Sequence, residues 1–218
     1  EENKMKIISF FNNNAKTGKT TTAFNIAIKF SEKGLKVLAI DTDPKFDLTS
    51  MFGIKDIQSV KDYELLDKNT KIETVAVNDN LEVIAIDTGR RGYGKYKALK
   101  NYLLTLEEYD VIIIDTAPSF HEYLPSVLFA SDIYVVAKDD WRETIGIKSV
   151  IDFARDLNKK ISGIILTEKT SNEPSFDAFE KLLDEYQLKT TIKKEGENEK
   201  DYNDLAEEMI QREMITQK

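Results

Sequence analysis

The sequence lacks cysteine altogether and holds a single histidine, His121, in 218 residues. Without cysteine the chain forms no disulfide, no thiolate metal centre and no iron–sulfur cluster. One histidine cannot build a multi-histidine metal site. No apolar run approaches the ~20 residues of a membrane-spanning helix, and no secretory signal is visible. The composition therefore predicts a soluble protein of the cytoplasm.

Basic residues are fewer than acidic ones. The chain has 31 Lys and Arg against 39 Asp and Glu, which gives a formal net charge of −8 and a pI of 4.9. A global basic surface for nucleic acid is therefore excluded, and any such contact must be a local patch. The length fits a single domain over residues 1–218. We expect residues 1–4 to be a tag remnant or a flexible start, and residues 193–201 to be a mobile loop.

One polar stretch, from Asn12 to Thr21, lies between an apolar run and a helix-like run. Strand, loop, Gly-Lys-Thr and helix, in this order, are the layout of a phosphate-binding loop. Backbone N–H groups of such a loop and the dipole of the following helix favour an anion. Lys19 would reach the β and γ phosphates, and the Thr20 hydroxyl would coordinate Mg²⁺. The residues expected to hold the nucleotide are Asn13, Asn14, Ala15, Lys16, Thr17, Gly18, Lys19, Thr20 and Thr21.

The loop departs from the usual phosphate-loop pattern in its first half. Asn13 stands where such a loop has a glycine, and Ala15 and Lys16 occupy positions where glycine would ease the tight backbone. Asn tolerates left-handed conformations, so the loop can still be built. The alternative is a chance Gly-Lys-Thr in an ordinary turn.

Carboxylates follow two further apolar runs. Val37–Ile40 is followed by Asp41 and Asp43, and Val111–Ile114 is followed by Asp115. Asp115 is interpreted as the acid that holds Mg²⁺ directly or through water, and a carboxylate on the other strand can orient the attacking water. For each Asp the alternative is a helix cap or a turn former. Their order and spacing after the phosphate loop favour the functional interpretation.

Short β-branched runs alternate with amphipathic segments along the chain. Several runs are apolar on both faces, as buried parallel strands are. This rhythm predicts an α/β fold with a doubly wound, mostly parallel sheet and helices on both faces. The expected strands are 6–11, 36–40, 81–86, 111–114, 133–137 and 161–166, with 190–192 as an edge strand. The expected helices are 20–33, 96–106, 123–130, 143–157, 176–186 and 201–212.

These motifs resemble those of the ParA/MinD family of P-loop ATPases, and most closely the small ParA-type plasmid partition ATPases. The matching pieces are Gly18–Ala23, Lys33–Pro44 and Tyr109–Ser119, and the match is dense over residues 5–140. The resemblance implies an ATPase that binds ATP or ADP with Mg²⁺ and forms an ATP-dependent homodimer. It also implies contacts with nonspecific DNA and with a centromere-binding adaptor protein that stimulates hydrolysis.

The resemblance assigns roles to individual residues. Lys19 would bind the phosphates, and Asp43 would support water activation with Asp41 beside it, so the implied catalytic set is Lys19, Asp43 and Asp41. Thr20, Asp115 and Asp43 would serve the Mg²⁺ shell. Glu168 stands where relatives often carry a basic residue, so adenine preference rests on the resemblance alone.

The family's signature lysine is replaced here by Asn14, while other lysines occur nearby at Lys16 and Lys45. In the family this lysine crosses the dimer to the partner's phosphates, so its loss leaves phosphate charge unmatched. One hypothesis is that Lys16 or Lys45 restores the charge. The alternative is that both are solvated surface lysines.

The densest basic patch consists of Arg90, Arg91, Lys95, Lys97 and Lys100. It predicts a contact with nonspecific DNA or with a partner, against the alternative of a solvated loop and helix face. The C-terminal segment 201–218 is acidic, whereas a membrane-targeting helix would be basic and apolar. No membrane contact is therefore expected.

The sequence favours a cytoplasmic, nucleoid-associated partition ATPase whose nucleotide state controls its assembly. An alternative from another class is a nucleotide-binding regulator or scaffold with little ATPase activity. A third is an ATP-dependent ligase of the same fold, which would need a substrate pocket for which no distinctive residues are evident.

Overall fold

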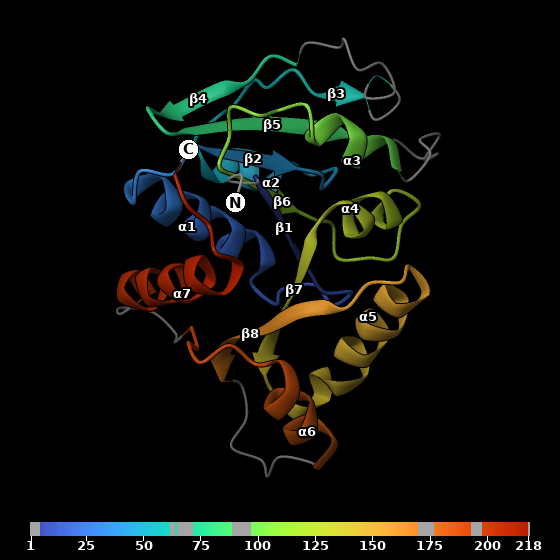
Figure 1. Ribbon diagram of the computed structural model, residues 1–218. Helices are drawn as coiled ribbons and strands as arrows, with labels where there is room; N and C mark the ends of the chain where they lie inside the picture. Colours follow the sequence, from blue (N-terminus) through green and yellow to red (C-terminus); the bar gives the residue numbers. More distant parts are fainter. Residues whose placement is uncertain are drawn as a thin grey trace.

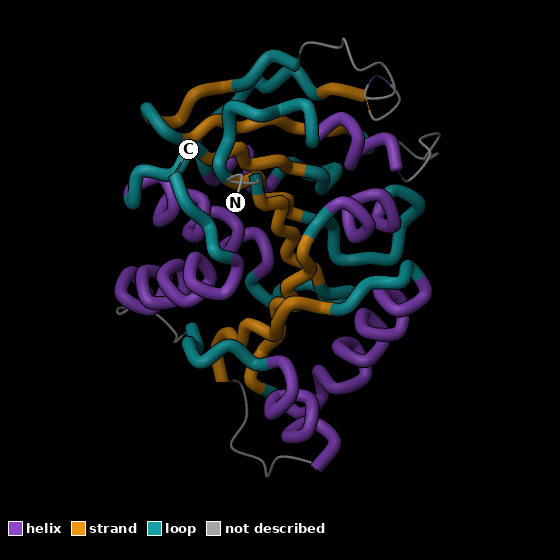
Figure 2. Tube along the Cα trace, in the orientation of Figure 1, coloured by secondary structure: helices purple, strands orange, loops and turns teal. Residues whose placement is uncertain are grey.

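The computed structural model describes residues 5–61, 64, 72–88, 97–169, 177–192 and 198–217 of the chain. Side chains are described throughout these ranges except at positions 168, 169 and 198. Figure 1 shows a central sheet with helices packed against both faces, and Figure 2 shows the same trace by secondary structure.

The sheet has eight strands in the order β3-β5-β2-β6-β1-β7-β8, with β4 paired to β5. The β4–β5 pair is antiparallel, and the other pairs are parallel. This arrangement confirms the predicted doubly wound, mostly parallel sheet. The strands are β1 (Lys6–Phe11), β2 (Val37–Asp41), β3 (Val60–Lys61), β4 (Val75–Asn78), β5 (Leu81–Asp87), β6 (Val111–Asp115), β7 (Asp132–Asp139) and β8 (Ile161–Lys169).

Burial on both faces explains why the inner strands carry continuous apolar runs. On β6, Ile113 packs into the core cluster that includes α1, while Ile112 and Ile114 pack into the cluster that includes α3 and α4. Successive residues of a strand point to opposite faces of the sheet. When both faces are covered, every position of the strand is buried and therefore favours an apolar residue. The helices are α1 (Lys19–Glu32), α2 (Asp47–Met51), α3 (Lys97–Leu103), α4 (Leu124–Ala130), α5 (Thr144–Asp156), α6 (Asp177–Tyr186) and α7 (Asn198–Glu213), with a short 3₁₀ turn η2 (Trp141–Glu143).

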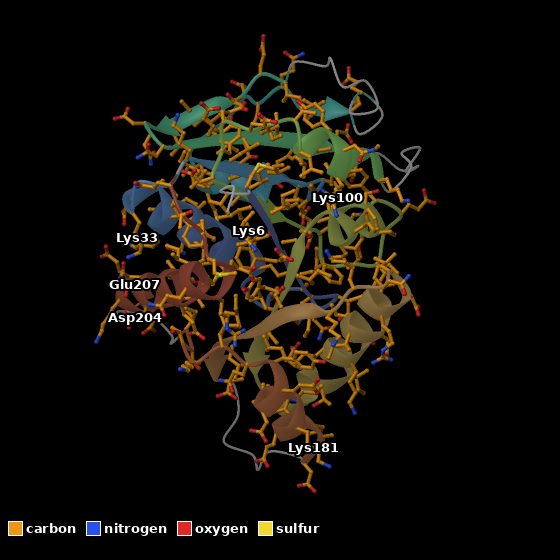
Figure 3. The ribbon with its side chains drawn as sticks, viewed as in Figure 1. Lys6, Lys33, Lys100, Lys181, Asp204 and Glu207 are labelled. Atoms are coloured by element: carbon orange, nitrogen blue, oxygen red, sulfur yellow. The ribbon has the colours of Figure 1, made fainter. Side chains whose placement is uncertain are left out.

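The last helix, α7, packs beside α1 on one face of the sheet (Figure 1). Its apolar side chains Leu205 and Met209 are fully buried in the same cluster as Phe30 of α1. At the surface, Lys33 donates a hydrogen bond to Glu207 across the two helices at 2.9 Å, and both side chains are labelled in Figure 3. Because exposed ion pairs contribute only ~0–1 kcal/mol, the apolar contact holds α7 in place.

Two sequence predictions differ from the structure near the C-terminus. Thr190–Ile192 is not an edge strand; the Ile192 N–H donates to the Leu166 carbonyl at 2.9 Å, and Gln187 forms an isolated bridge with Ile164. The predicted loop 193–201 overlaps α7, which begins at Asn198, because Asp201 and Tyr202 pack inward as part of the helix. Residues 193–197 and 1–4 lie outside the described part of the chain.

The sequence also left β3, β4 and α2 unpredicted. β4 and β3 pair with the outer strand β5, and their residues are mostly exposed, so they lack the buried apolar pattern that marks the inner strands. The five-residue helix α2 is too short for a helical period to show. Within the described ranges, no helix combines the length and apolar composition needed to cross a membrane.

Ile113→Ala should lower the free energy of unfolding by about 2–5 kcal/mol, because it opens a cavity at a fully buried position of a central strand. Ile145→Ala is the matched control: this isoleucine is 78% exposed, and its truncation should change stability by less than about 0.5 kcal/mol. Urea unfolding of both variants measures the difference, and equal effects would contradict the assignment of Ile113 to the core.

Candidate functional site

The carboxyl ends of three adjacent strands, β1, β2 and β6, meet at one edge of the sheet. The parallel register pairs Asp41 of β2 with Asp115 of β6, and Asp115 with Phe10 of β1. The predicted phosphate loop follows β1 directly. Strand order therefore brings the loop and both aspartates together, as expected for a site at the carboxyl edge of an α/β sheet.

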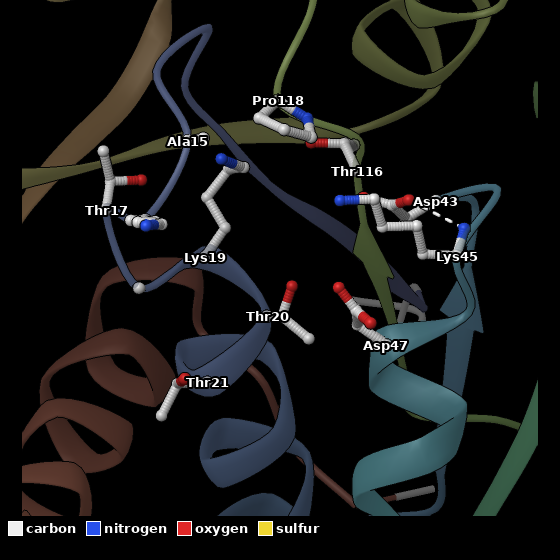
Figure 4. Close-up of a pocket in the computed structure, with 12 residues that line it drawn as sticks. Ala15, Thr17, Lys19, Thr20, Thr21, Asp43, Lys45, Asp47, Thr116 and Pro118 are labelled. Carbon is white, nitrogen blue, oxygen red and sulfur yellow. Dashed lines mark hydrogen bonds between the residues drawn. The ribbon is translucent and has the colours of Figure 1, made fainter.

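A pocket of 360 Å³ opens beside this loop (Figure 4). Its walls come from the phosphate loop, the start of α1, the β2–α2 connection and the segment after β6. The lining residues are Ala15, Lys16, Thr17, Gly18, Lys19, Thr20, Thr21, Asp43, Lys45, Asp47, Thr116 and Pro118. Most of the predicted phosphate-holding residues are therefore in one wall, whereas Asn13 and Asn14 lie behind it.

The loop backbone adopts left-handed conformations at two positions. Gly18 has φ of 93° and Lys16 has φ of 59°. Gly18 precedes α1 without a side-chain cap, so the N–H groups of the first helical turn are available to an anion. Lys16 adopts a left-handed conformation that usually favours glycine, and this backbone strain costs roughly 1–3 kcal/mol.

Lys19 is held inside the loop. The residue is only 5% exposed, and its Nζ donates to the Asn14 carbonyl at 2.9 Å. Burial lowers the pKa of Lys19, while the nearby carboxylates of Asp115, Asp43 and Glu143 act to raise it. The ammonium is thus positioned before any ligand arrives. A phosphate would give it an anionic partner and so offset the cost of burying its charge.

Asp115 is the most unusual polar group of the site. It is fully buried, and neither carboxylate oxygen has a hydrogen-bond partner among the described residues. Burial raises the pKa of Asp115 to about 8, opposed by the neighbouring Thr20 hydroxyl and the Lys19 ammonium. Two buried oxygens without partners beside a hydroxyl are a donor set that suits Mg²⁺, which prefers hard oxygen ligands.

The two aspartates that follow β2 have different surroundings. Both oxygens of Asp41 are occupied: Oδ1 accepts from the Asp43 N–H at 3.1 Å, and Oδ2 accepts from the N–H and the hydroxyl of Thr49, each at 2.9 Å. Burial raises the pKa of Asp41 to about 6. Asp43 lines the pocket, whereas Asp41 does not. Asp41 therefore ties α2 to the site rather than facing a ligand.

Sequence reasoning missed a hydrogen-bonded cluster behind the loop. Oε2 of Glu143 accepts from the side-chain amides of Asn12 and Asn14, at 3.2 and 3.0 Å. A Cβ on Gly146 would come within 3.0 Å of the Asn13 and Asn14 side chains, so α5 approaches the loop closely here. Glu143 is 129 residues from Asn14 in sequence, and no local pattern signals this contact.

The end of β8 supports the loop from the other side. The Thr167 hydroxyl donates to the carbonyls of Thr17 and Ala137, at 2.9 and 3.2 Å. A Cβ on Gly18 would meet the Thr167 methyl at 3.2 Å, a second reason for glycine there. The Glu168 side chain lies outside the described residues.

The predicted basic patch is largely beyond the described part of the chain. Arg90, Arg91 and Lys95 lie outside it. Lys97 is exposed at the start of α3, and Lys100 on the same helix places its Nζ 5.2 Å from the Phe129 ring centroid. The patch therefore stays a prediction.

Known proteins are similar to this chain in sequence and in architecture. A family model described as an AAA domain matches residues 5–167. An uncharacterised protein of Methanocaldococcus jannaschii is 32% identical over 71% of this chain and 67% of its own length. A virulence plasmid ParA family protein of Chlamydia psittaci is 27% identical over 88% of this chain and 82% of its own length.

A solved structure agrees. A putative plasmid partition protein of Borrelia burgdorferi, bound to AMPPNP, superposes with a TM-score of 0.73 at 25% identity, covering 96% of this chain and 99% of that one. The fold and the matched region define a P-loop nucleotide-binding ATPase class. Within that class, the chain belongs to the ParA/MinD family of plasmid partition ATPases and related proteins.

Asp115→Asn should stabilise the nucleotide-free chain more at high pH than at low pH. The unfolded aspartate ionises near about pH 3.9 and the folded one near pH 8, so the penalty is absent below the unfolded pKa and grows as pH rises toward about 8. We expect a gain of about 1–3 kcal/mol at about pH 8 and less at about pH 5. Urea unfolding at both pH values tests this, and a larger gain at the lower pH would refute it.

Glu143→Ala should destabilise the chain by about 1–3 kcal/mol, because the amides of Asn12 and Asn14 lose a charged acceptor. The control is Glu73→Ala, at an exposed position outside the helices, for which we expect less than about 0.5 kcal/mol. Thermal or urea unfolding compares the two. Indistinguishable losses would show that the cluster contributes nothing to stability.

Proposed function

We propose that this chain is an ATP-binding and hydrolysing partition protein whose nucleotide state controls its assembly. The observation that supports this most directly is the buried, unpartnered Asp115 carboxylate beside a phosphate loop that already holds Lys19 in place. A carboxylate in this setting is costly without a cation, and a lysine in this setting is costly without an anion. A magnesium nucleotide satisfies both.

The proposed binding mode follows from the lining of the pocket. N–H groups of the loop and of the first turn of α1 hold the phosphates, with Lys19 as the charged donor. Thr20 and Asp115, with Asp43 nearby, would hold Mg²⁺ directly or through water, and the ion would neutralise charge on the phosphates. Thr17 adds a buried hydroxyl oxygen without a partner among the described residues, which a phosphate contact would satisfy.

Hydrolysis transfers the terminal phosphoryl group of ATP to water, and ADP is the leaving group. Asp43 is the residue that we assign to orienting this water, because its carboxylate lines the pocket at the end of β2. Asp41 acts as a positioning residue: it accepts the Asp43 N–H and holds Thr49 of α2. This assignment revises the catalytic set implied by the resemblance, in which Asp41 stood beside Asp43 without a distinct role.

The surface beside the pocket supports an ATP-dependent homodimer. Phe120 is 45% exposed two residues after the lining residue Pro118, and Ile145 is 78% exposed next to Gly146, which touches the loop. We propose that these two exposed apolar side chains belong to the contact between protomers. We further propose that the protein binds a centromere-binding adaptor. We also propose that it contacts nonspecific DNA through Arg90, Arg91, Lys95 and Lys97. Its proposed location is the cytoplasm, in association with the nucleoid.

A regulator with little turnover is the second candidate, and the cluster at Asn14 favours it. Glu143 places a carboxylate next to the loop where the family's signature lysine would stand. A negative charge here works against phosphate binding and against charge development in hydrolysis. Such a regulator would bind nucleotide tightly without DNA-stimulated turnover.

The experiment compares wild type with Asp43→Ala by phosphate release and by light scattering with ATP, ADP and Mg²⁺. We expect turnover to fall about 100-fold or more and an ATP-dependent dimer to persist. Asp56→Ala, at an exposed aspartate outside the pocket, is the matched control and should behave as wild type. If the wild-type chain binds ATP but shows no turnover, with or without DNA, the regulator is favoured. If Asp43→Ala has unchanged turnover, Asp43 does not orient the attacking water.

A further inference from the structure

Three lysines line the pocket, and each comes from a different segment. Lys19 begins α1, Lys16 belongs to the loop, and Lys45 belongs to the connection between β2 and α2. Lys16 and Lys45 are exposed, and neither makes an ion pair within the described ranges. Lys16 and Lys45 thus leave two ammonium charges without a partner at a pocket suited to a polyanion.

The backbone around Lys45 is fixed by Asp43. The Lys45 N–H donates to Asp43 Oδ1 at 2.9 Å, and the Phe46 N–H donates to the Asp43 carbonyl at 2.9 Å. Phe46 then takes a left-handed φ of 52° as α2 begins. In this tight turn the side chain of Lys45 extends back over Asp43 into the pocket, toward the wall that carries Lys19 (Figure 4).

No ion pair fixes this orientation. Asp43 and Asp47 line the same pocket, yet among the described residues neither carboxylate forms an ion pair with Lys45. A solvated lysine would gain as much by pointing outward, where its rotamer freedom is greater. The side chain lies over the water-orienting carboxylate instead.

The direction of a bound nucleotide follows from the loop. A phosphate loop surrounds the inner phosphates with backbone N–H groups, so the terminal phosphate extends from the loop toward the neighbouring strand ends. In this chain β6 lies next to β1 and β2 lies beyond β6, and the pocket continues from the loop past Thr116 to Asp43 and Lys45. Lys16, on the loop itself, is on the side of the inner phosphates.

We propose that Lys45 binds the terminal phosphate of a nucleoside triphosphate and is the residue that distinguishes triphosphate from diphosphate in this chain. The proposal rests on the nucleotide binding proposed above. It places the charge that recognises the terminal phosphate within the same protomer, on the turn that also carries Asp43. Loss of that phosphate on hydrolysis then removes a contact to the β2–α2 connection.

The test measures binding of AMPPNP and of ADP, each with Mg²⁺, to the full chain by calorimetry. Lys45→Gln should weaken AMPPNP binding about tenfold or more, because a charged hydrogen bond is lost, and should change ADP binding less than about twofold. Lys45→Arg should recover most of the AMPPNP affinity, since it keeps the charge. Lys55→Gln removes the same charge at an exposed position outside the pocket and should leave both affinities unchanged.

Lys16→Gly provides the internal comparison. It removes a charge from the loop side of the pocket and is expected to shift AMPPNP and ADP affinities by similar factors. If Lys45→Gln leaves AMPPNP binding unchanged, or weakens both nucleotides equally, the inference is wrong although the proposed function stands. If the wild-type chain binds neither nucleotide, the proposed function fails and the inference fails with it.

Discussion

The parallel pairing of β6 with β1 on one side and β2 on the other is the constraint on which the site depends. This pairing sets Asp115 opposite Asp41 and next to the end of β1, where the phosphate loop starts. It also buries all three strands on both faces, so that water does not reach the Asp115 carboxylate. The same strands therefore position the charged groups of the site and exclude the water that would otherwise solvate their charges.

This burial concentrates unfavourable electrostatics in a small volume. Lys19 has its pKa lowered by burial, and Asp41 and Asp115 have theirs raised by the same cause. Asp41 is compensated by Thr49 and the Asp43 amide, and Lys19 by the Asn14 carbonyl. Asp115 has no hydrogen-bond partner among the described residues, and it directly precedes the pocket residue Thr116. The apolar packing in the rest of the sheet stabilises the fold and offsets the free energy of burying these charged groups.

The inner part of the fold could be read from sequence because its signals are local. Val111–Ile114 and Val37–Ile40 are apolar at every position, which is what two-sided burial requires, and the aspartates that follow them mark the strand ends. The Gly-Lys-Thr motif is local as well. Outer elements such as β4 lack this pattern because most of their residues are exposed to solvent.

The remaining features of the site arise from pairs that are distant in sequence or from rotamers. The contact of Glu143 with Asn14, and that of Thr167 with Thr17, join residues that only the completed sheet brings together. The family pattern marked Asn14 as a departure but gave no reason for it. The side-chain direction of Lys45 depends on a tight turn set by Asp43, which no periodicity encodes.

The two long-range supports of the phosphate loop have a consequence for the order of folding. Asn12 and Asn14 are synthesised before Glu143 and Thr167, which follow only after β6 and β7 have been made. Closing such distant contacts is slow compared with forming a helix. During synthesis the nucleotide pocket therefore becomes rigid only after β8 has been made, although its signature motif leaves the ribosome well before these supports.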